Sequence, residues 1–204
     1  MNIFEFADSN PIGAFVYTME TIMENEDNDE EEHADAFLSM WPQVKDAIRD
    51  QYRKLHVLKL PLYDFHVPAI EGVPQVQLDV EFYNILISMN DCLNNTKHFE
   101  ELIHFTQDML VLFDWSDDED SYDFLRCDIA DAYDSMGQYN DRDKLYRSML
   151  APGKNERIAS RYALSLICNH EFDKAEEVLK PYEGSDNELI KDRFKFLKEM
   201  KAWR

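Results

Sequence analysis

Apolar residues recur at steps of three and four along most of this chain, the spacing of one face of an α-helix. From about residue 80 to the C-terminus the pattern predicts helices near 80–94, 98–113, 121–136, 139–150, 155–169, 172–181 and 186–202. The acidic insert Asp114–Asp120 should be a loop between two of them. The pattern therefore predicts an all-α protein.

The N-terminal part, residues 1–56, also follows a helical pattern. Asn10-Pro11 provides an N-cap residue and a proline at the first helical position, which predicts a helix running to about Glu26. The acidic run Glu24–Glu32 should be a loop. A second helix should follow, kink or restart at Pro42, and end near His56.

Residues 57–80 interrupt this pattern. Prolines 61, 68 and 74 and Gly72 lie among apolar residues there, and proline at this spacing favours extended or turn backbone. Because the segment is too apolar for a solvated linker, we expect an extended connector packed on the body of the protein. The chain should thus comprise an N-terminal helical region at 1–56, the connector at 57–80 and a helical body at 81–204.

One short sequence motif occurs three times in the body, at residues 94–102, 135–142 and 168–175, each time between two helical stretches. Its aromatic residues Phe99, Tyr139 and Phe172 are 40 and 33 residues apart. Self-similarity at such a period is typical of stacked antiparallel helical hairpins.

The hairpins resemble the tetratricopeptide repeat family. The second hairpin has the pattern Ile129-Ala130-x-x-Tyr133, Gly137-x-Tyr139 and then Tyr146, but carries Arg142 where that family has a small residue. The third hairpin matches at Tyr162, Ala163, Leu166, Phe172 and Ala175, with His170 in place of glycine, and the first is degenerate, with Asn90 where a small residue is usual. The resemblance implies an α-solenoid with repeats at about 81–114, 121–153 and 155–182 and a capping helix at 186–202.

A concave groove lined by the first helix of each hairpin is a further implication of the resemblance. Carried over to this chain, the partner-binding positions are Asn84, Asp91, Asn94, Asn95, Phe124, Asp128, Asp131, Asp134, Arg157 and Arg161. One subset of the family grips a C-terminal carboxylate, but only Arg157 and Arg161 match its clamp. Asp128 would repel a carboxylate and should pair with Arg161 instead.

Acidic residues dominate the implied groove. Asp128, Asp131 and Asp134 follow a three-residue spacing and so share a helix face. We therefore predict that the groove binds a basic peptide or a basic partner helix, and that Asp131→Lys and Asp134→Lys leave the fold intact. A solvated acidic face without a ligand is the alternative.

The charge of the whole chain narrows the classes of partner. Its 204 residues carry a formal net charge of −21, which disfavours nucleic acid and anionic membranes because like charges repel over about a Debye length, ~8 Å. The favoured function is a non-enzymatic protein-interaction scaffold whose partner has a basic segment. A nucleic-acid mimic that inhibits a nucleic-acid-binding protein is the second hypothesis.

Candidate catalytic, metal and cofactor sites are poor, and we predict none. Glu30-x-x-His33 and Glu101-x-x-His104 reproduce the ligand spacing of di-iron helix bundles, but the further inward carboxylates that such a site needs are expected to face solvent. A metal-dependent helical-bundle enzyme is therefore a distant alternative.

Cys92, Cys127 and Cys168 should be reduced core thiols, and Met1–Asp8 lacks the features of a signal peptide, so we expect a cytoplasmic protein without a membrane span.

Overall fold

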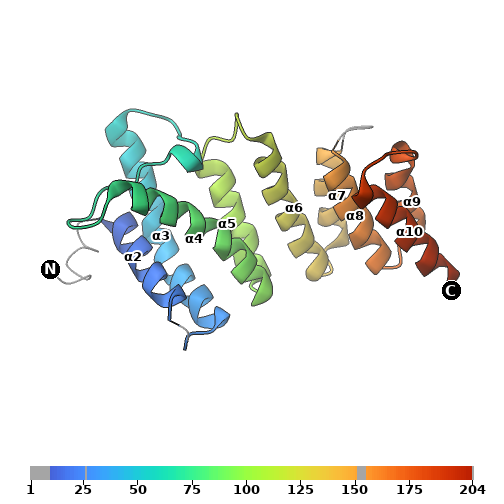
Figure 1. The fold of residues 1–204 in the computed structure, drawn as a ribbon, viewed down its shortest axis with the longest axis horizontal. Helices are drawn as coiled ribbons and strands as arrows, with labels where there is room; N and C mark the ends of the chain where they lie inside the picture. The colour runs from blue at the N-terminus through green and yellow to red at the C-terminus, as the bar shows by residue number, and fades with distance from the viewer. Residues whose placement is uncertain (1–9, 26, 151–154, 204) are drawn as a thin grey trace. The chain divides into compact units, whose positions relative to one another are not determined.

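A computed structural model describes residues 10–25, 27–150 and 155–203 of the chain. Within these residues the regular secondary structure is helical, with no β-strand (Figure 1). None of the described helices is both long and apolar enough to cross a membrane. The expectation about Met1–Asp8 lies outside the described residues.

The helices of the body begin and end within a few residues of their predicted positions. The described α-helices are α2 (Pro11–Met23), α3 (Glu30–Leu55), α4 (Gln75–Asn95), α5 (Phe99–Leu112), α6 (Glu119–Ser135), α7 (Tyr139–Met149), α8 (Glu156–Cys168), α9 (Phe172–Leu179) and α10 (Glu188–Ala202). Two short 3-10 turns, η1 (Leu62–Asp64) and η2 (Lys180–Tyr182), accompany them. The prediction of an all-helical chain is therefore confirmed for the described residues.

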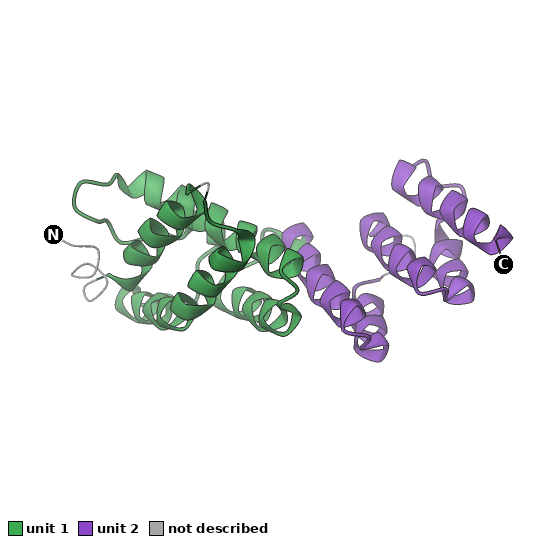
Figure 2. Ribbon diagram, turned by 90° about the horizontal axis from the view of Figure 1, so that it is seen from below, with its two compact units in different colours: residues 1–119 green, residues 120–204 purple. Residues whose placement is uncertain are grey.

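The chain divides into two compact units, residues 1–119 and residues 120–204 (Figure 2). Unit 1 takes in α2, α3, the connector, α4 and α5, whereas unit 2 takes in α6 to α10. The division falls at the first turn of α6 and not after residue 80. The first predicted hairpin thus belongs with the N-terminal helices, because it shares their core.

Aromatic rings form the centre of unit 1, and each surrounding element contributes at least one. Phe37 of α3 meets Phe105 of α5 edge-on at a centroid distance of 4.8 Å. Phe82 of α4 lies 6.1 Å from Phe15 of α2 and 5.4 Å from Phe65 of the connector. Edge-to-face and tilted ring pairs of this kind add stabilisation beyond the apolar area they bury.

The connector packs on unit 1, as predicted from its apolar content. Its buried residues are Leu62, Phe65, Val67 and Ile70. Ile70 approaches α2 so closely that a Cβ atom on Gly13 would lie 2.6 Å from its Cδ1 atom, so a larger residue at position 13 would force the Ile70 side chain to move. The predicted length of the connector was wrong, however, because α4 begins at Gln75, directly after Pro74, and residues 75–80 are helical.

One prediction for the N-terminal region also needs correction, and of the kink or restart predicted at Pro42 the restart does not occur. Glu30–Glu32 form the first turn of α3 and not part of a loop, because Asp29 and Glu32 make a capping box in which each side chain accepts a hydrogen bond from the other residue's backbone N–H. The helix then continues through Pro42 without restarting. A proline costs a helix one backbone hydrogen bond, and α3 stays helical despite this loss.

The three copies of the repeated sequence motif form the same type of backbone turn. Lys97, Gly137 and His170 all adopt left-handed backbone conformations, with φ of 63°, 72° and 60°. In each turn the next residue's N–H donates to the carbonyl five residues earlier, at 2.9, 2.8 and 2.8 Å, giving the pairs His98–Leu93, Gln138–Tyr133 and Glu171–Leu166. This hydrogen bond is the Schellman closure of a helix C-terminus, and it joins α4 to α5, α6 to α7 and α8 to α9.

Unit 2 is built around α8, which packs against both α9 and α10. The Tyr162 ring of α8 stacks on the Tyr146 ring of α7 at 4.7 Å.

The cysteines are free, with Cys92 and Cys127 buried. Burial raises the pKa of the Cys127 thiol to about 12. Cys168 is exposed at the end of α8, so the expectation of three core thiols was wrong for this residue.

The left-handed turns predict opposite effects of two substitutions. Gly137→Val should destabilise α6 and α7 by about 1–2 kcal/mol, because a β-branched residue resists positive φ. Lys97→Gly, at the equivalent position of unit 1, should be neutral or stabilising. Hydrogen exchange of the amides in α4 to α7 measures both effects, and equal loss of protection in the two variants would contradict the assignment of strain to these turns.

Candidate functional site

The predicted groove residues fall into two sets, one in each unit. Asn84, Asp91, Asn94 and Asn95 lie on α4 in unit 1 and are exposed. Phe124, Asp128, Asp131 and Asp134 lie on α6, and Arg157 and Arg161 on α8, in unit 2. Phe124 and Arg157 are exposed, whereas the three aspartates and Arg161 are partly buried. The structure therefore brings the members of each set together, but each set has to be considered by itself.

Arg161 pairs with two carboxylates in the middle of α6. Its Nη2 donates to Asp128 Oδ1 at 2.5 Å and its Nε to Asp131 Oδ2 at 2.6 Å. The guanidinium carbon also lies 5.0 Å from the centre of the Phe124 ring, within cation–π range. The expected pairing of Arg161 with Asp128 is thus present. Asp131 additionally accepts a short hydrogen bond from the Tyr146 hydroxyl.

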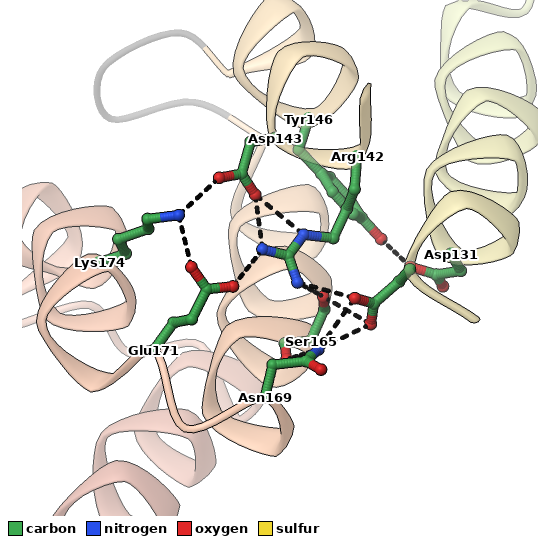
Figure 3. Close-up of polar contacts among 9 residues, drawn as sticks. Asp131, Arg142, Asp143, Tyr146, Ser165, Asn169, Glu171 and Lys174 are labelled. Atoms are coloured by element: carbon green, nitrogen blue, oxygen red, sulfur yellow. Dashed lines mark hydrogen bonds and ion pairs between the residues drawn. The ribbon is translucent and has the colours of Figure 1, made fainter. Parts of the chain in front are cut away.

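Arg142 is the centre of a second network, drawn in Figure 3. Its side chain has no exposed surface, yet it donates to three carboxylates. Nη1 reaches Asp134 Oδ1 at 2.7 Å, Nη2 reaches Asp143 Oδ1 at 2.7 Å, and Nη2 also reaches Glu171 Oε1 at 2.5 Å. A buried guanidinium requires such partners, because an uncompensated buried charge costs several kcal/mol.

The Arg142 network joins four successive elements of unit 2. Its carboxylates come from α6, α7 and the turn before α9, and α8 contributes the Ser165 hydroxyl, which accepts from Nη1 at 3.2 Å. Asp134 accepts further hydrogen bonds from Ser165 and Asn169 at 2.9 Å. Lys174 of α9 bridges Asp143 and Glu171 (Figure 3). These partners account for the burial of a charged residue at position 142.

The acids of α6 therefore neutralise arginines of their own unit. Asp128 and Asp131 pair with Arg161, and Asp134 pairs with Arg142. The expectation that lysine would be tolerated at Asp131 and Asp134 treated both as unpaired surface positions, whereas both pair with arginines. We now expect Asp134→Lys to destabilise unit 2, because it would place an ammonium group against the buried Arg142 guanidinium. The sequence analysis had anticipated the Asp128–Arg161 pair, but not the pairing of Asp131 with Arg161 and of Asp134 with Arg142, 30 and 8 residues away.

Unit 1 carries almost all of the net charge. Residues 1–119 have 25 acidic and 6 basic side chains, a formal charge of −19 with histidine neutral, whereas residues 120–204 have 17 and 15, a formal charge of −2. Unit 1 thus has about four acidic side chains for each basic one. The long-range field of the protein therefore originates in unit 1.

An apolar stripe crosses the exposed face of α4. Val76, Val80, Tyr83 and Ile87 follow steps of four, three and four residues and are 74%, 52%, 38% and 37% exposed. Asn84, Asp91, Asn94 and Asn95 continue this face. The opposite face of the same helix carries the buried set Leu78, Phe82, Ile85 and Met89. One helix thus presents two apolar faces, of which the part of the chain that the structure describes covers only one.

Sequence reasoning identified only part of this stripe. The four polar positions had been placed in the groove through the tetratricopeptide resemblance, but Val76 and Val80 had been assigned to the connector. Counting apolar positions at helical steps from residue 76 would have shown a second face. The exposure of that face is a property of the packed structure and not of the pattern.

Metal-ligating side chains gather at one place in unit 1. The ligand atoms of Glu31, Asp35 and His98 lie within 4.8 Å of one another. Glu31 and Asp35 belong to the first turns of α3, and His98 directly precedes α5. Neither His33 nor His104, the histidines of the two Glu-x-x-His motifs, is part of this group.

No family model, curated protein or solved structure matches this chain. The resemblance to tetratricopeptide repeats stays a prediction, supported by the three equivalent turns. The stacking of all three hairpins into a solenoid also stays a prediction, because the first hairpin belongs to unit 1 and the other two to unit 2.

The Arg142 network predicts a large effect of one substitution. Arg142→Met should destabilise unit 2 by about 3–5 kcal/mol, because it leaves three clustered carboxylates without their shared cation. Lys191→Met removes a cation from exposed pairs in the same unit and should cost less than about 1 kcal/mol. Hydrogen exchange of the amides in α7 to α9 compares the two variants, and a similar small effect of both would refute a structural role for Arg142.

The same network predicts sensitivity of unit 2 to acid. Burial disfavours the ionised forms of Asp143 and Glu171, but hydrogen bonds from Lys174 and Arg142 outweigh it and hold the pKa of each carboxyl below its ordinary value of 3.8 or 4.5. The stabilisation is therefore complete above the ordinary pKa values and lost as the pH falls through the lowered ones. The stability of unit 2 can be followed by equilibrating the protein in urea between pH 6 and pH 2 and then applying a short hydrogen-exchange pulse at one fixed pH. In the wild type the protection of unit 2 amides should fall as the equilibration pH falls. In Arg142→Met this protection should depend less on pH.

Proposed function

We propose that this chain is a non-enzymatic protein-interaction module, and that it binds a basic amphipathic helix along the exposed face of α4. The observation that carries the proposal is the apolar stripe Val76, Val80, Tyr83 and Ile87 on the most acidic part of the molecule. Three free thiols, two of them buried, support a reducing compartment such as the cytoplasm.

The stripe has the dimensions of a helix-docking site. From Val76 to Ile87 the stripe extends for about 16 Å at ~1.5 Å per residue, which matches about three turns of a partner helix, and the polar positions up to Asn95 continue the same face to the end of α4. Contiguous exposed apolar side chains with a polar border are typical of interaction surfaces. An amphipathic helix would place its own apolar residues between them at steps of three and four.

Charge selects a basic partner over an acidic or neutral one. With a formal charge of −19, unit 1 attracts cationic segments and accelerates their association at low salt. Asp91, Asn94 and Asn95, at the C-terminal end of the exposed face, offer hydrogen-bond acceptors to lysine or arginine side chains. The aspartates of α6 contribute less than expected, because Arg142 and Arg161 already neutralise them.

Three fluorescent probe peptides of about 20 residues test the proposal. The first is amphipathic with leucines on one face and lysines and arginines on the other, the second has glutamates in place of the basic residues, and the third is a scrambled, non-amphipathic version of the first. Fluorescence anisotropy should show that the first peptide binds at least about tenfold more tightly than the other two, with an affinity that falls as salt rises. Equal binding of the amphipathic and scrambled basic peptides would reduce the interaction to charge alone and overturn the proposal.

Substitutions in the stripe make the prediction specific to α4. Val80→Glu should weaken binding of the basic amphipathic peptide at least about tenfold, because it places a carboxylate in the centre of the apolar contact. Val111→Glu is the matched control, since Val111 is an isolated exposed apolar residue of α5, 63% exposed, and should leave the affinity within about twofold. Both variants should keep the wild-type stability, because surface changes typically alter it by only ~0.5 kcal/mol.

A second copy of the chain is the competing occupant of the stripe. Sedimentation of the wild type and of Val80→Glu separates the two possibilities. A monomeric wild type supports a heterologous partner, whereas a wild-type dimer that Val80→Glu converts to a monomer would replace the proposal with self-association.

A further inference from the structure

Three potential metal ligands from distant parts of the chain converge at one end of unit 1. Glu31 and Asp35 are one helical turn apart on α3, so their carboxylates point from the same face. The Nε2 atom of His98 lies 2.8 Å from Glu31 Oε1, and the ligand atoms of all three residues lie within 4.8 Å of one another. A modest adjustment of the exposed carboxylates would place all three around one cation.

We propose that Glu31, Asp35 and His98 form a binding site for a first-row divalent transition-metal ion of the Zn²⁺ type. One imidazole and two carboxylates are established ligands of such ions, and three protein ligands leave coordination positions for water. The imidazole distinguishes the group from a purely acidic surface. It also disfavours Ca²⁺ and Mg²⁺, which prefer oxygen ligands.

The opposite side of the His98 ring supports the same assignment. Its Nδ1 atom faces the carboxylate of Glu101, with a separation of 3.9 Å from Oε2. A carboxylate on the second ring nitrogen is the usual partner of a metal-bound histidine, because it fixes the tautomer and makes the ligating nitrogen more basic. His98 thus has Glu31 beside its Nε2 atom and Glu101 on the side of Nδ1. The 3.9 Å separation from Glu101 is longer than a hydrogen bond, so that carboxylate would have to move closer to orient the ring.

The backbone on both sides of the site is defined before any ion binds. The N–H of His98 donates to Leu93 O at 2.9 Å, which closes the turn between α4 and α5. The capping box of Asp29 and Glu32 fixes the start of α3. An ion would therefore mainly order the carboxylate side chains, and it would link α3 to a turn 67 residues further along the chain.

The surrounding charge favours a cation. Asp29, Glu30 and Glu32 flank Glu31 in the sequence, and Glu100 and Glu101 follow His98 closely. The aligned N–H groups at the start of α3 carry a partial positive charge that opposes a cation. The negative charge of the neighbouring carboxylates is larger than this partial charge. Because only the folded chain brings the three ligands together, binding should raise the stability of unit 1.

Titration of the full-length, chelator-treated protein with ZnCl₂ tests this proposal. Isothermal titration calorimetry should show one saturable site per chain, and the melting temperature should rise on addition of Zn²⁺ but not of Ca²⁺ or Mg²⁺ at the same concentration. His98→Ala should lower the Zn²⁺ affinity at least about tenfold and abolish the rise in melting temperature. His104→Ala is the matched control, because it removes an exposed histidine of the neighbouring helix α5, and should leave both unchanged.

The circular dichroism spectrum of each metal-free variant shows whether its fold is intact. If His98→Ala loses helix content, the nearly isosteric Asp35→Asn provides the same test without altering the turn. Unchanged Zn²⁺ affinity and stoichiometry in either folded variant would overturn the proposal. A comparable response to Ca²⁺ or Mg²⁺ would also overturn it, because it would indicate only a general affinity of acidic side chains for cations.

Discussion

A guanidinium group without solvent must be surrounded by acceptors, and this requirement governs the architecture of unit 2. Arg142 has no exposed side-chain surface and reaches carboxylates from α6, from its own helix and from the turn before α9. Removing Arg142 would leave three clustered carboxylates without their shared cation. The position therefore specifies how α6, α7, α8 and α9 fit together, and it commits Asp134 and Glu171 to an internal role.

The pairing in unit 2 determines where a partner can bind. Arg142 and Arg161 together occupy the three aspartates that would otherwise make α6 an acidic wall. Unit 1 has only six basic residues for 25 acids, and it also exposes the apolar stripe of α4. The combination of field and apolar contact is what a basic amphipathic helix requires, because charge increases the rate of encounter and apolar burial supplies most of the binding free energy.

Local features of the fold could be predicted from the sequence. The helices of the body depend on apolar periodicity, and the three turns depend on chain segments of a few residues, so both were predicted closely. Most features that depend on distant residues were not, and the Asp128–Arg161 pair is an exception. The environment of Arg142, the exposure of the Val76 and Val80 side chains and the approach of His98 to Glu31 all require knowledge of which helices pack together. The start of α4 was missed for a different reason, since the prolines before it made residues 75–80 look like part of an extended segment.

Photo-cross-linking from the surface of α4 tests the central claim most directly. A photoreactive amino acid at position 80, in the middle of the stripe, should cross-link to the basic amphipathic peptide. The same group at position 111 of α5, or in place of the exposed Phe124 in unit 2, should give little product. Comparable cross-linking from all three positions, or efficient cross-linking from position 124 alone, would contradict the assignment of the binding surface to α4.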